Sequence, residues 1–269
     1  MKPCDKYISL EGKTALITGA GSGIGLAVAK LYAKYGANVA MVDVNDRCQK
    51  EAAAIGSQAK YFRCDVRKED EAAHTVEAVK ESFGKIDILV NNAGINVRKT
   101  VLDTTVEEWD LCIDIGLKGT FLFSKYTVPG MIEQGGGIVI NTASGAAIKG
   151  VPDAAPYNAV KGGVAALTRG MAVDFGKHNI RVNCICPGDI LTPMLIQEGL
   201  QTGKISTDTP KTQQEQEDMA KFLDSCGSYR PLRRIATAEQ IAYTFLFLAT
   251  DMSLYATGGS FVVDGGRCS

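Results

Sequence analysis

The sequence predicts an α/β fold: a single-domain, doubly wound parallel sheet with helices on both faces. Runs of β-branched and apolar residues alternate with amphipathic helical patterns along the chain, which is typical of right-handed β-α-β units. The strand-like runs ALIT, VAMV, ILV, IVIN and RVNCI are almost continuously apolar, as in strands that are buried on both faces. With 269 residues, 45% of them hydrophobic, we expect one large domain over residues 1–269.

The expected elements follow one another regularly in both halves of the chain. The first half predicts strands at 13–19, 37–44, 59–66 and 85–94, with helices at 24–36 and 74–84 and a helical segment between the second and third strands. The second half predicts a helix from about residue 105, a glycine-rich turn at 135–137, a strand at 138–144, a long helix beginning near Pro156, and strands at 180–188 and 261–266. Thr105 with Glu108, and Thr237 with Gln240, have the capping-box spacing that marks a helix start.

Residues 189–235 interrupt this alternation. Within them, the stretch 201–218 is polar and poor in core-forming residues, and it is too long for an ordinary connection. We expect this segment to be a mobile lid over a substrate site, with a disordered surface insertion as the alternative.

Charge and composition exclude several classes of function. The chain carries 29 basic and 30 acidic residues, and this balance argues against a protein that binds nucleic acid through its overall field. Residues 1–13 contain no signal-peptide core, and no apolar run reaches the roughly 18 residues of a membrane span, so we expect a cytoplasmic protein without membrane contacts. The eight cysteines include no C-x-x-C pair, so we expect reduced thiols and no metal site.

A glycine-rich turn lies between the first expected strand and helix. Its residues, Thr18-Gly19-Ala20-Gly21-Ser22-Gly23-Ile24-Gly25, have the spacing T-G-x-x-x-G-x-G rather than G-x-G-x-x-G. Gly19 permits a tight turn, Gly23 lets the backbone approach a pyrophosphate, and Gly25 lets the helix pack close to the strand. The amide groups at the helix N-terminus would then face an anion.

The second expected strand ends at Asp43, 20 residues after Gly23. A carboxylate at this position accepts hydrogen bonds from the ribose hydroxyls of an adenosine and repels a 2′-phosphate. Ala20 and Val44 are neutral where a phosphate binder would place a cation, and Arg47 is the cation nearby. The pattern therefore favours NAD over NADP; a turn-forming aspartate is the alternative interpretation of Asp43.

Further motifs follow in order along the chain. Asn91-Asn92-Ala93-Gly94 follows the fourth strand, Ser144 follows the fifth, Tyr157-x-x-x-Lys161 lies on the next helix, and Pro187-Gly188 follows the sixth strand. Together with the glycine-rich turn, they resemble the classical short-chain dehydrogenase/reductase family from about residue 10 to residue 266. The resemblance implies a Rossmann-like fold, a nicotinamide cofactor and a homo-oligomer, commonly a tetramer, formed through the last strand and its flanking glycines.

Tyr157 and Lys161 suit acid–base chemistry because residues four apart on a helix share one face. A nearby ammonium favours phenolate over phenol, so we expect Lys161 to lower the pKa of Tyr157 and make it the acid/base. Ser144 can hydrogen-bond the substrate oxygen and hold it in line with the phenol. The non-catalytic alternatives are that Tyr157 is an ordinary helix residue, that Lys161 is solvated and that Ser144 is a turn or cap residue.

The resemblance also implies further cofactor contacts: Asp65 and Val66 on the adenine side, a wall beside the adenosine ribose, and carboxamide contacts after Pro187. With the residues argued above, the expected cofactor-binding set is Gly19, Ser22, Gly23, Ile24, Gly25, Asp43, Asp65, Val66, Asn91, Ala93, Gly94, Tyr157, Lys161, Pro187, Ile190 and Thr192.

One position departs from the family pattern. Gly116 stands where the family usually has an asparagine, thought to hold a water in a proton relay from the lysine. A glycine carbonyl can still accept a hydrogen bond, and a relay rebuilt through Asp114 is the alternative. We expect an active enzyme in which asparagine at 116 would leave NAD binding unchanged.

The leading functional hypothesis is an NAD-dependent dehydrogenase that transfers hydride between the cofactor and a secondary alcohol or ketone. The stretch NNAGINVRKT resembles family members that act on sugar acids and polyols, which places Arg98 either near a substrate carboxylate or in solvent. Hydroxysteroid or bile-acid oxidation and 3-oxoacyl reduction are alternatives for the same small-molecule site. An NAD-binding sensor with little turnover is the alternative from another class.

Overall fold

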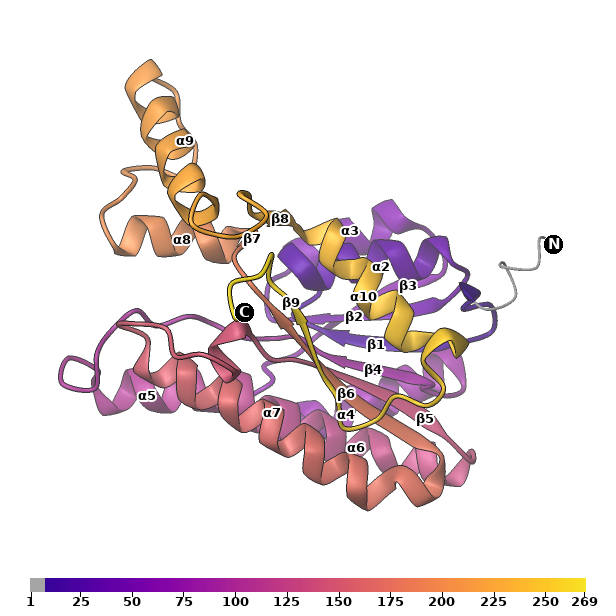
Figure 1. Ribbon diagram of the computed structural model, residues 1–269. Coiled ribbons are helices and arrows are strands. Elements are labelled where there is room, and N and C mark those ends of the chain that lie inside the picture. Colours follow the sequence, from indigo (N-terminus) through magenta and orange to yellow (C-terminus); the bar gives the residue numbers. More distant parts are fainter. Residues whose placement is uncertain (1–7) are drawn as a thin grey trace.

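The computed structural model describes residues 8–269 (Figure 1). Part of the segment 1–13, for which we expect no signal peptide, and Cys4 therefore lie outside the described residues. Seven parallel strands form one sheet in the order β3-β2-β1-β4-β5-β6-β9. The strands are β1 (Thr14–Thr18), β2 (Asn38–Asp43), β3 (Ala59–Arg63), β4 (Ile88–Asn91), β5 (Gly137–Thr142), β6 (Ile180–Pro187) and β9 (Ser260–Val263). The predicted single-domain parallel sheet is confirmed.

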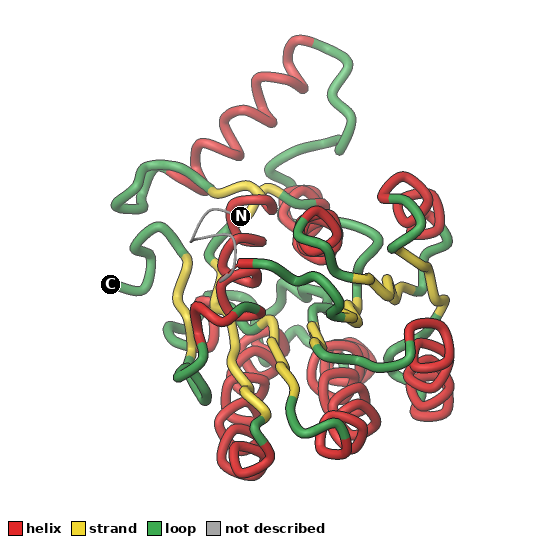
Figure 2. The backbone as a smooth tube through the Cα atoms, turned by 90° about the vertical axis from the view of Figure 1, so that its right-hand side faces the viewer, coloured by secondary structure: helices red, strands yellow, loops and turns green. Residues whose placement is uncertain are grey.

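Helices cover both faces of the sheet. The bounds are α2 (Gly23–Lys34), α3 (Arg47–Ile55) and α10 (Ala238–Ala249) on one face, and α4 (Glu69–Phe83), α6 (Gly119–Glu133) and α7 (Ala155–Phe175) on the other, with α5 (Val106–Ile113) beside α7 (Figures 1 and 2). Alternate strand residues enter opposite cores: Ile17 packs with α2 and α10, whereas Leu16 packs with α4 and α6. Strands buried on both faces explain the continuous apolar runs in the sequence.

Two of the expected helix starts are confirmed by their hydrogen bonds. Thr105 caps α5 with Glu108, and Thr237 caps α10 with Gln240, each in a reciprocal capping box. Between α5 and α6 the helix widens into a π-helical turn, Asp114–Lys118.

The segment 189–235 folds into a helical pair instead of an irregular insertion. It contains α8 (Pro193–Gln201) and α9 (Gln213–Gly227), which share a small core of Leu195, Ile205 and Phe222. The short strands β7 (Ile190–Leu191) and β8 (Ala236–Thr237) pair at its base, and α9 projects from the body (Figure 1). A capping box of Thr212 and Glu215 starts α9, a signal that the polar composition of this stretch concealed.

The chain reverses its direction of strand addition between β1 and β4. Strands β2 and β3 are added on one side of β1, and β4, β5 and β6 on the other. Open α/β sheets bind ligands at the carboxyl edge beside such a switch point. None of the helices within residues 8–269 is long and apolar enough to cross a membrane.

Candidate active site

A cavity of about 690 Å³ opens at the carboxyl edge of the sheet. Residues that follow β1, β2, β3, β4, β5 and β6 line it, together with α8 and Arg267 near the C-terminus. Nearly all of the predicted site residues meet here: Gly19, Ser22, Gly23, Ile24, Asp43, Asp65, Val66, Ala93, Gly94, Ser144, Tyr157, Lys161, Pro187, Ile190 and Thr192.

The glycine-rich turn forms the floor of one end of the cavity. Gly19 and Gly23 have positive φ angles of 64° and 53°, which glycine adopts without strain. The helix α2 begins at Gly23 with no acidic residue in its first turn, so the positive end of its dipole is not neutralised locally. This end of the cavity is therefore suited to a phosphate group.

Gly25 belongs to the predicted set but does not line the cavity within residues 8–269. It is buried against the turn, where an added Cβ atom would lie 2.6 Å from Asn92 Nδ2. This is the close packing of helix and turn that its position in the motif predicts.

Asp43 presents a fixed carboxylate at the same end. Its Oδ2 accepts a hydrogen bond from the Gly21 amide at 2.9 Å, and its Oδ1 accepts one from the Asn45 amide at 2.9 Å. Arg67, a cation that also lines this end, is held by Asp65 through a bidentate pair with distances of 2.6 to 3.0 Å. This hydrogen bond from Arg67 is also the main reason why the pKa of Asp65 is lowered.

Asn91 is the second predicted residue that does not line the cavity within residues 8–269. It is buried, and its Nδ2 donates to Ser124 Oγ at 3.1 Å and to Asn141 Oδ1 at 2.9 Å, so it ties neighbouring elements together beneath the cavity. Asn92, which we did not assign to the site, lines the cavity instead. Its Nδ2 donates to the carbonyls of Thr18 and Gly19, both at 3.2 Å, and so fixes the turn.

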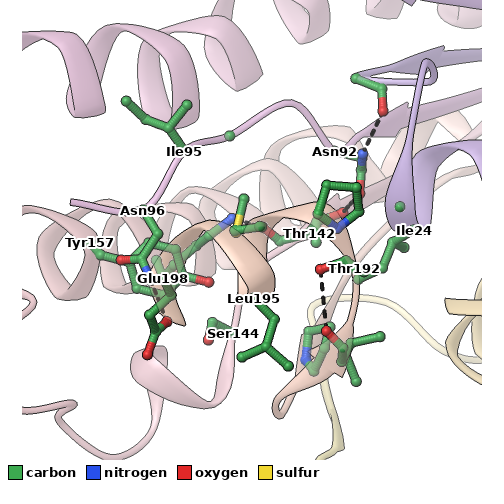
Figure 3. Close-up of a pocket in the computed structure, with 18 of the residues that line it drawn as sticks. Ile24, Asn92, Ile95, Asn96, Thr142, Ser144, Tyr157, Thr192, Leu195 and Glu198 are labelled. Carbon is green, nitrogen blue, oxygen red and sulfur yellow. Dashed lines mark hydrogen bonds between the residues drawn. The ribbon is translucent and has the colours of Figure 1, made fainter. Parts of the chain in front are cut away.

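The second end of the cavity holds the three predicted catalytic residues, of which Figure 3 labels Ser144 and Tyr157. Tyr157 lies in the first turn of α7, and Lys161 lies one turn later, with Nζ 5.6 Å from the centre of the Tyr157 ring. Lys161 Nζ donates to the Thr142 carbonyl at 2.7 Å, which anchors the ammonium between β5 and α7. Ser144 follows β5 and accepts a hydrogen bond from the Ala146 amide at 3.1 Å.

Burial dominates the titration of this pair. Burial raises the pKa of Tyr157, and the hydrogen bond with Ser144 is the main influence that lowers it. Burial lowers the pKa of Lys161 to about 8. From the sequence we expected the Lys161 charge to lower the pKa of Tyr157; in the structure the pKa is raised instead, and burial of the phenol is the largest cause. A lysine with a pKa of about 8 can nonetheless gain and lose a proton near neutral pH.

Gly116 lies in the π-helical turn with no room for a side chain. A Cβ atom at this position would lie 2.5 Å from Val160 Cγ1, and Val160 immediately precedes Lys161. The Gly116 carbonyl accepts a hydrogen bond from Thr120 Oγ1 at 2.8 Å. Asp114, the alternative relay residue, pairs with Lys118 at 3.4 Å and does not line the cavity within residues 8–269.

Beyond Tyr157, the cavity contains a polar corner that sequence reasoning did not predict. Glu198 of α8 lies against Asn96 and Arg98, which belong to the loop after β4. Arg98 is 16% exposed, so it is neither in solvent nor free: its Nε lies 3.6 Å from Glu198 Oε1. The sequence contains no motif that indicates Glu198.

Comparison with known proteins agrees with this geometry. The family model for short chain dehydrogenases matches residues 13–202, and a second model, for enoyl-(acyl carrier protein) reductase, matches residues 202–267. The chain is 36% identical over 260 residues to 2,5-dichloro-2,5-cyclohexadiene-1,4-diol dehydrogenase of Sphingobium indicum, covering 96% of this chain and 97% of that one.

Two solved structures have nearly the same fold. L-sorbose reductase from Gluconobacter frateurii, complexed with NADPH and L-sorbose, superposes with a TM-score of 0.89 at 32% identity, covering 98% and 99% of the two chains. A 3-ketoacyl-(acyl-carrier-protein) reductase from Brucella melitensis, complexed with NADH, gives 0.83 at 34% identity, covering 97% and 100%. With the family model spanning more than half of the sequence, the chain belongs to the short-chain dehydrogenase/reductase family and is an oxidoreductase that acts on alcohols or ketones.

Proposed function

We propose that this enzyme transfers hydride between NAD and a secondary alcohol or its ketone. The observation that carries the proposal is a single cavity with Asp43 and the glycine-rich turn at one end, and Ser144, Tyr157 and Lys161 at the other. The residues fit a dinucleotide because a helix N-terminus and a fixed carboxylate are spaced along one cavity. A bound nicotinamide dinucleotide supplies the acceptor or donor of the hydride.

The choice of NAD rests on the electrostatics around Asp43. Two backbone amides hold its carboxylate in place, and the guanidinium of Arg67 is already occupied by Asp65. A 2′-phosphate would meet this fixed negative charge, whereas two ribose hydroxyls would donate to it. NADPH and NADH both occur among the related structures, so a direct titration with each dinucleotide is the test.

Three side chains of this protein orient the substrate and transfer its proton. Tyr157 takes the alcohol proton in the oxidation direction and returns it in reduction. Ser144 hydrogen-bonds the substrate oxygen and, through its bond with Tyr157, favours the phenolate. Lys161, whose pKa is lowered to about 8, passes the proton on from the phenol.

A sugar acid or polyol suits the substrate end better than a hydroxysteroid, because Asn96, Arg98 and Glu198 line it. Reduction of 3-oxoacyl thioesters is the second candidate, supported by the similarity to the Brucella melitensis reductase and by the apolar side chains of Ile95, Leu195 and Val151 in the same lining.

The test is absorbance at the reduced-nicotinamide band with purified protein, NAD or NADP, and a panel of polyols, sugar acids, hydroxysteroids and 3-oxoacyl thioesters. We expect turnover with NAD and at least one polyhydroxylated substrate. Tyr157→Phe should abolish turnover and leave the affinity for NAD nearly unchanged. Cofactor binding without turnover across the panel would favour the sensor, and full activity of the variant would remove the assigned acid/base.

We also propose that the enzyme is a homo-oligomer, with a tetramer as the expected assembly, and that it works in the cytoplasm. Strand β9 is an edge of the sheet, and Leu254, Tyr255 and Val262 around it are exposed apolar residues, which favours a subunit contact there. Light scattering on the purified protein gives the assembly directly. The seven described cysteines are free, as a reducing compartment requires.

A further inference from the structure

The polar corner of Asn96, Arg98 and Glu198 joins the loop after β4 to helix α8. Figure 3 shows two of its members, Asn96 and Glu198, beside Tyr157. Glu198 Oε2 accepts a hydrogen bond from Asn96 Nδ2 at 2.9 Å, and Glu198 Oε1 lies 3.6 Å from Arg98 Nε. The Glu198 carboxylate is close enough to Tyr157 for its charge to raise the pKa of the phenol. Figure 3 shows Glu198 beside Tyr157, so the cavity wall next to the phenol includes this carboxylate.

Arg98 is paired with Glu198 at the cavity wall. Its Nε atom is buried and faces Glu198, and this nitrogen makes no hydrogen bond within residues 8–269. Asn96 is fixed in the same way, because its amide nitrogen donates to Glu198. Both partners line the cavity, but the Glu198 side chain is 26% exposed and the Arg98 side chain 16%, so the carboxylate is the more accessible of the two to a ligand.

Within residues 8–269, the other cations that line this end are Lys161, Arg267 and Lys204, and Lys161 Nζ is held by the Thr142 carbonyl. Arg267 lies 3.9 Å from Asp189, and the buried Arg230 also binds Asp189. Lys204 lines the cavity but is exposed to solvent, where a charge attracts a ligand weakly. A carboxylate placed next to the reacting carbon would therefore face Glu198, and like charges in a partly buried site repel each other.

We propose that Glu198 is a specificity-determining residue that accepts a hydrogen bond from a substrate hydroxyl next to the reacting carbon, so that the enzyme takes neutral polyols and ketoses and rejects aldonic acids. A carboxylate is an acceptor without donors, so it binds a hydroxyl and excludes a second carboxylate. Asn96 and Arg98 are positioning residues that hold Glu198 toward the cavity. The inference rests on the proposed function, whose sugar-acid branch it removes.

Matched substrate pairs test the proposal. D-Glucitol and D-gluconate differ only at carbon 1, as do galactitol and galactonate. The two pairs differ from each other in stereochemistry. For each pair we would measure kcat/KM with NAD for the wild type, for Glu198→Gln and for the control Glu217→Gln. Glu217 lies on α9, where its Oε1 accepts from Gln213 Nε2 at the surface.

We expect the wild type and the control to prefer the polyol, and Glu198→Gln to lower the ratio of polyol to aldonate by about 10- to 100-fold, the range of a hydrogen bond to a charged group. A general folding defect would lower both rates and leave this ratio unchanged. A wild type that prefers the aldonate, or a variant with the wild-type ratio, would overturn the proposal.

Failure of the proposed function gives a different result. If the wild type oxidises neither member of any pair, calorimetric titration of the NAD-loaded protein with glucitol and with gluconate decides the matter. Binding of glucitol alone, lost in Glu198→Gln, would support the hydroxyl site while removing the dehydrogenase assignment for these substrates. Binding of neither compound would overturn the hydroxyl site as well.

Discussion

Replacement of Gly116 by alanine should destabilise the protein, although removal of a glycine from a helix usually stabilises it. The usual gain is about 0.5–1 kcal/mol. Here the new Cβ atom would lie 2.5 Å from Val160 Cγ1, and Val160 is 1% exposed, with a branched side chain that cannot turn aside easily. Overpacking of this kind costs about 1–3 kcal/mol, so we expect a net loss of about 1–2 kcal/mol, or roughly 2–8 °C in Tm.

A double-mutant cycle isolates the cause. Val160→Ala alone removes two buried methyl groups and should cost about 2 kcal/mol. In the double variant, the nearest remaining side-chain atom of residue 160 is Cβ, at 3.7 Å from the new methyl group, which is an ordinary contact. The combined loss in the free energy of unfolding should therefore be smaller than the sum of the single losses, by about 1 kcal/mol.

Denaturant unfolding of the four proteins measures this coupling, and titration with NAD controls for the site. Gly116 does not line the cavity within residues 8–269, so the affinity for NAD should not change in any folded variant. Strictly additive losses, or a Gly116→Ala protein as stable as the wild type, would refute the steric argument. Gly116→Asn meets the same obstacle, so a loss of activity in that variant would first have to be separated from its loss of stability.

Three further predictions concern charged groups. Asp43→Ser should weaken NAD binding about 10-fold and improve NADP binding, because it removes the charge that faces a 2′-phosphate; equal changes for both dinucleotides would contradict this. The rate of alcohol oxidation should rise with pH through about 8, and the rate of ketone reduction should fall, because loss of a proton from the pair of Tyr157 and Lys161 creates the proton acceptor. Lys161→Arg should remove this inflection from the pH profile. Arg230→Met should lower stability by about 3–5 kcal/mol, measured by denaturant unfolding, because the buried guanidinium pairs with Asp189 and donates to the Asp264 carbonyl at 3.0 Å; a loss below 1 kcal/mol would show that the pair is dispensable.

Local patterns were sufficient for the sheet and for the nucleotide end of the cavity. Parallel strands buried on both faces must be apolar at successive positions, so continuous apolar runs predicted β1, β4 and β6. Asp43 was predictable because its position relative to Gly23 follows from the length of one strand–helix–strand unit. These features depend on short stretches of chain, in which spacing determines geometry.

Gly25 and Asn91 are the two residues of the predicted set that do not line the cavity within residues 8–269. Both belong to motifs whose neighbours line the cavity, but a motif does not say which of its members face the ligand and which hold the backbone. Asn91 is the last residue of β4, and its side chain turns into the sheet toward Asn141, whereas Asn92 faces the cavity. The alternation of side chains along a strand separates the two, and a shift of one residue in the predicted strand end reverses the assignment.

The charge at the substrate end could not be predicted from local sequence, because it depends on residues that are far apart in the chain. Arg98 on its own indicates a site for a carboxylate, and residue type and neighbourhood both supported that interpretation. Glu198 offsets that charge from a helix in a segment where composition predicted only a polar lid. It lies 102 positions after Asn96, its hydrogen-bond partner. Since the attraction or repulsion of a substrate depends on the sum of the charges that meet in the cavity, the sign of a binding site cannot be assigned from one residue until its partner in the fold is known. The polyol and aldonate pairs therefore test the central consequence of the fold: that the packing of α8 against the loop after β4 determines which substrates reach Tyr157.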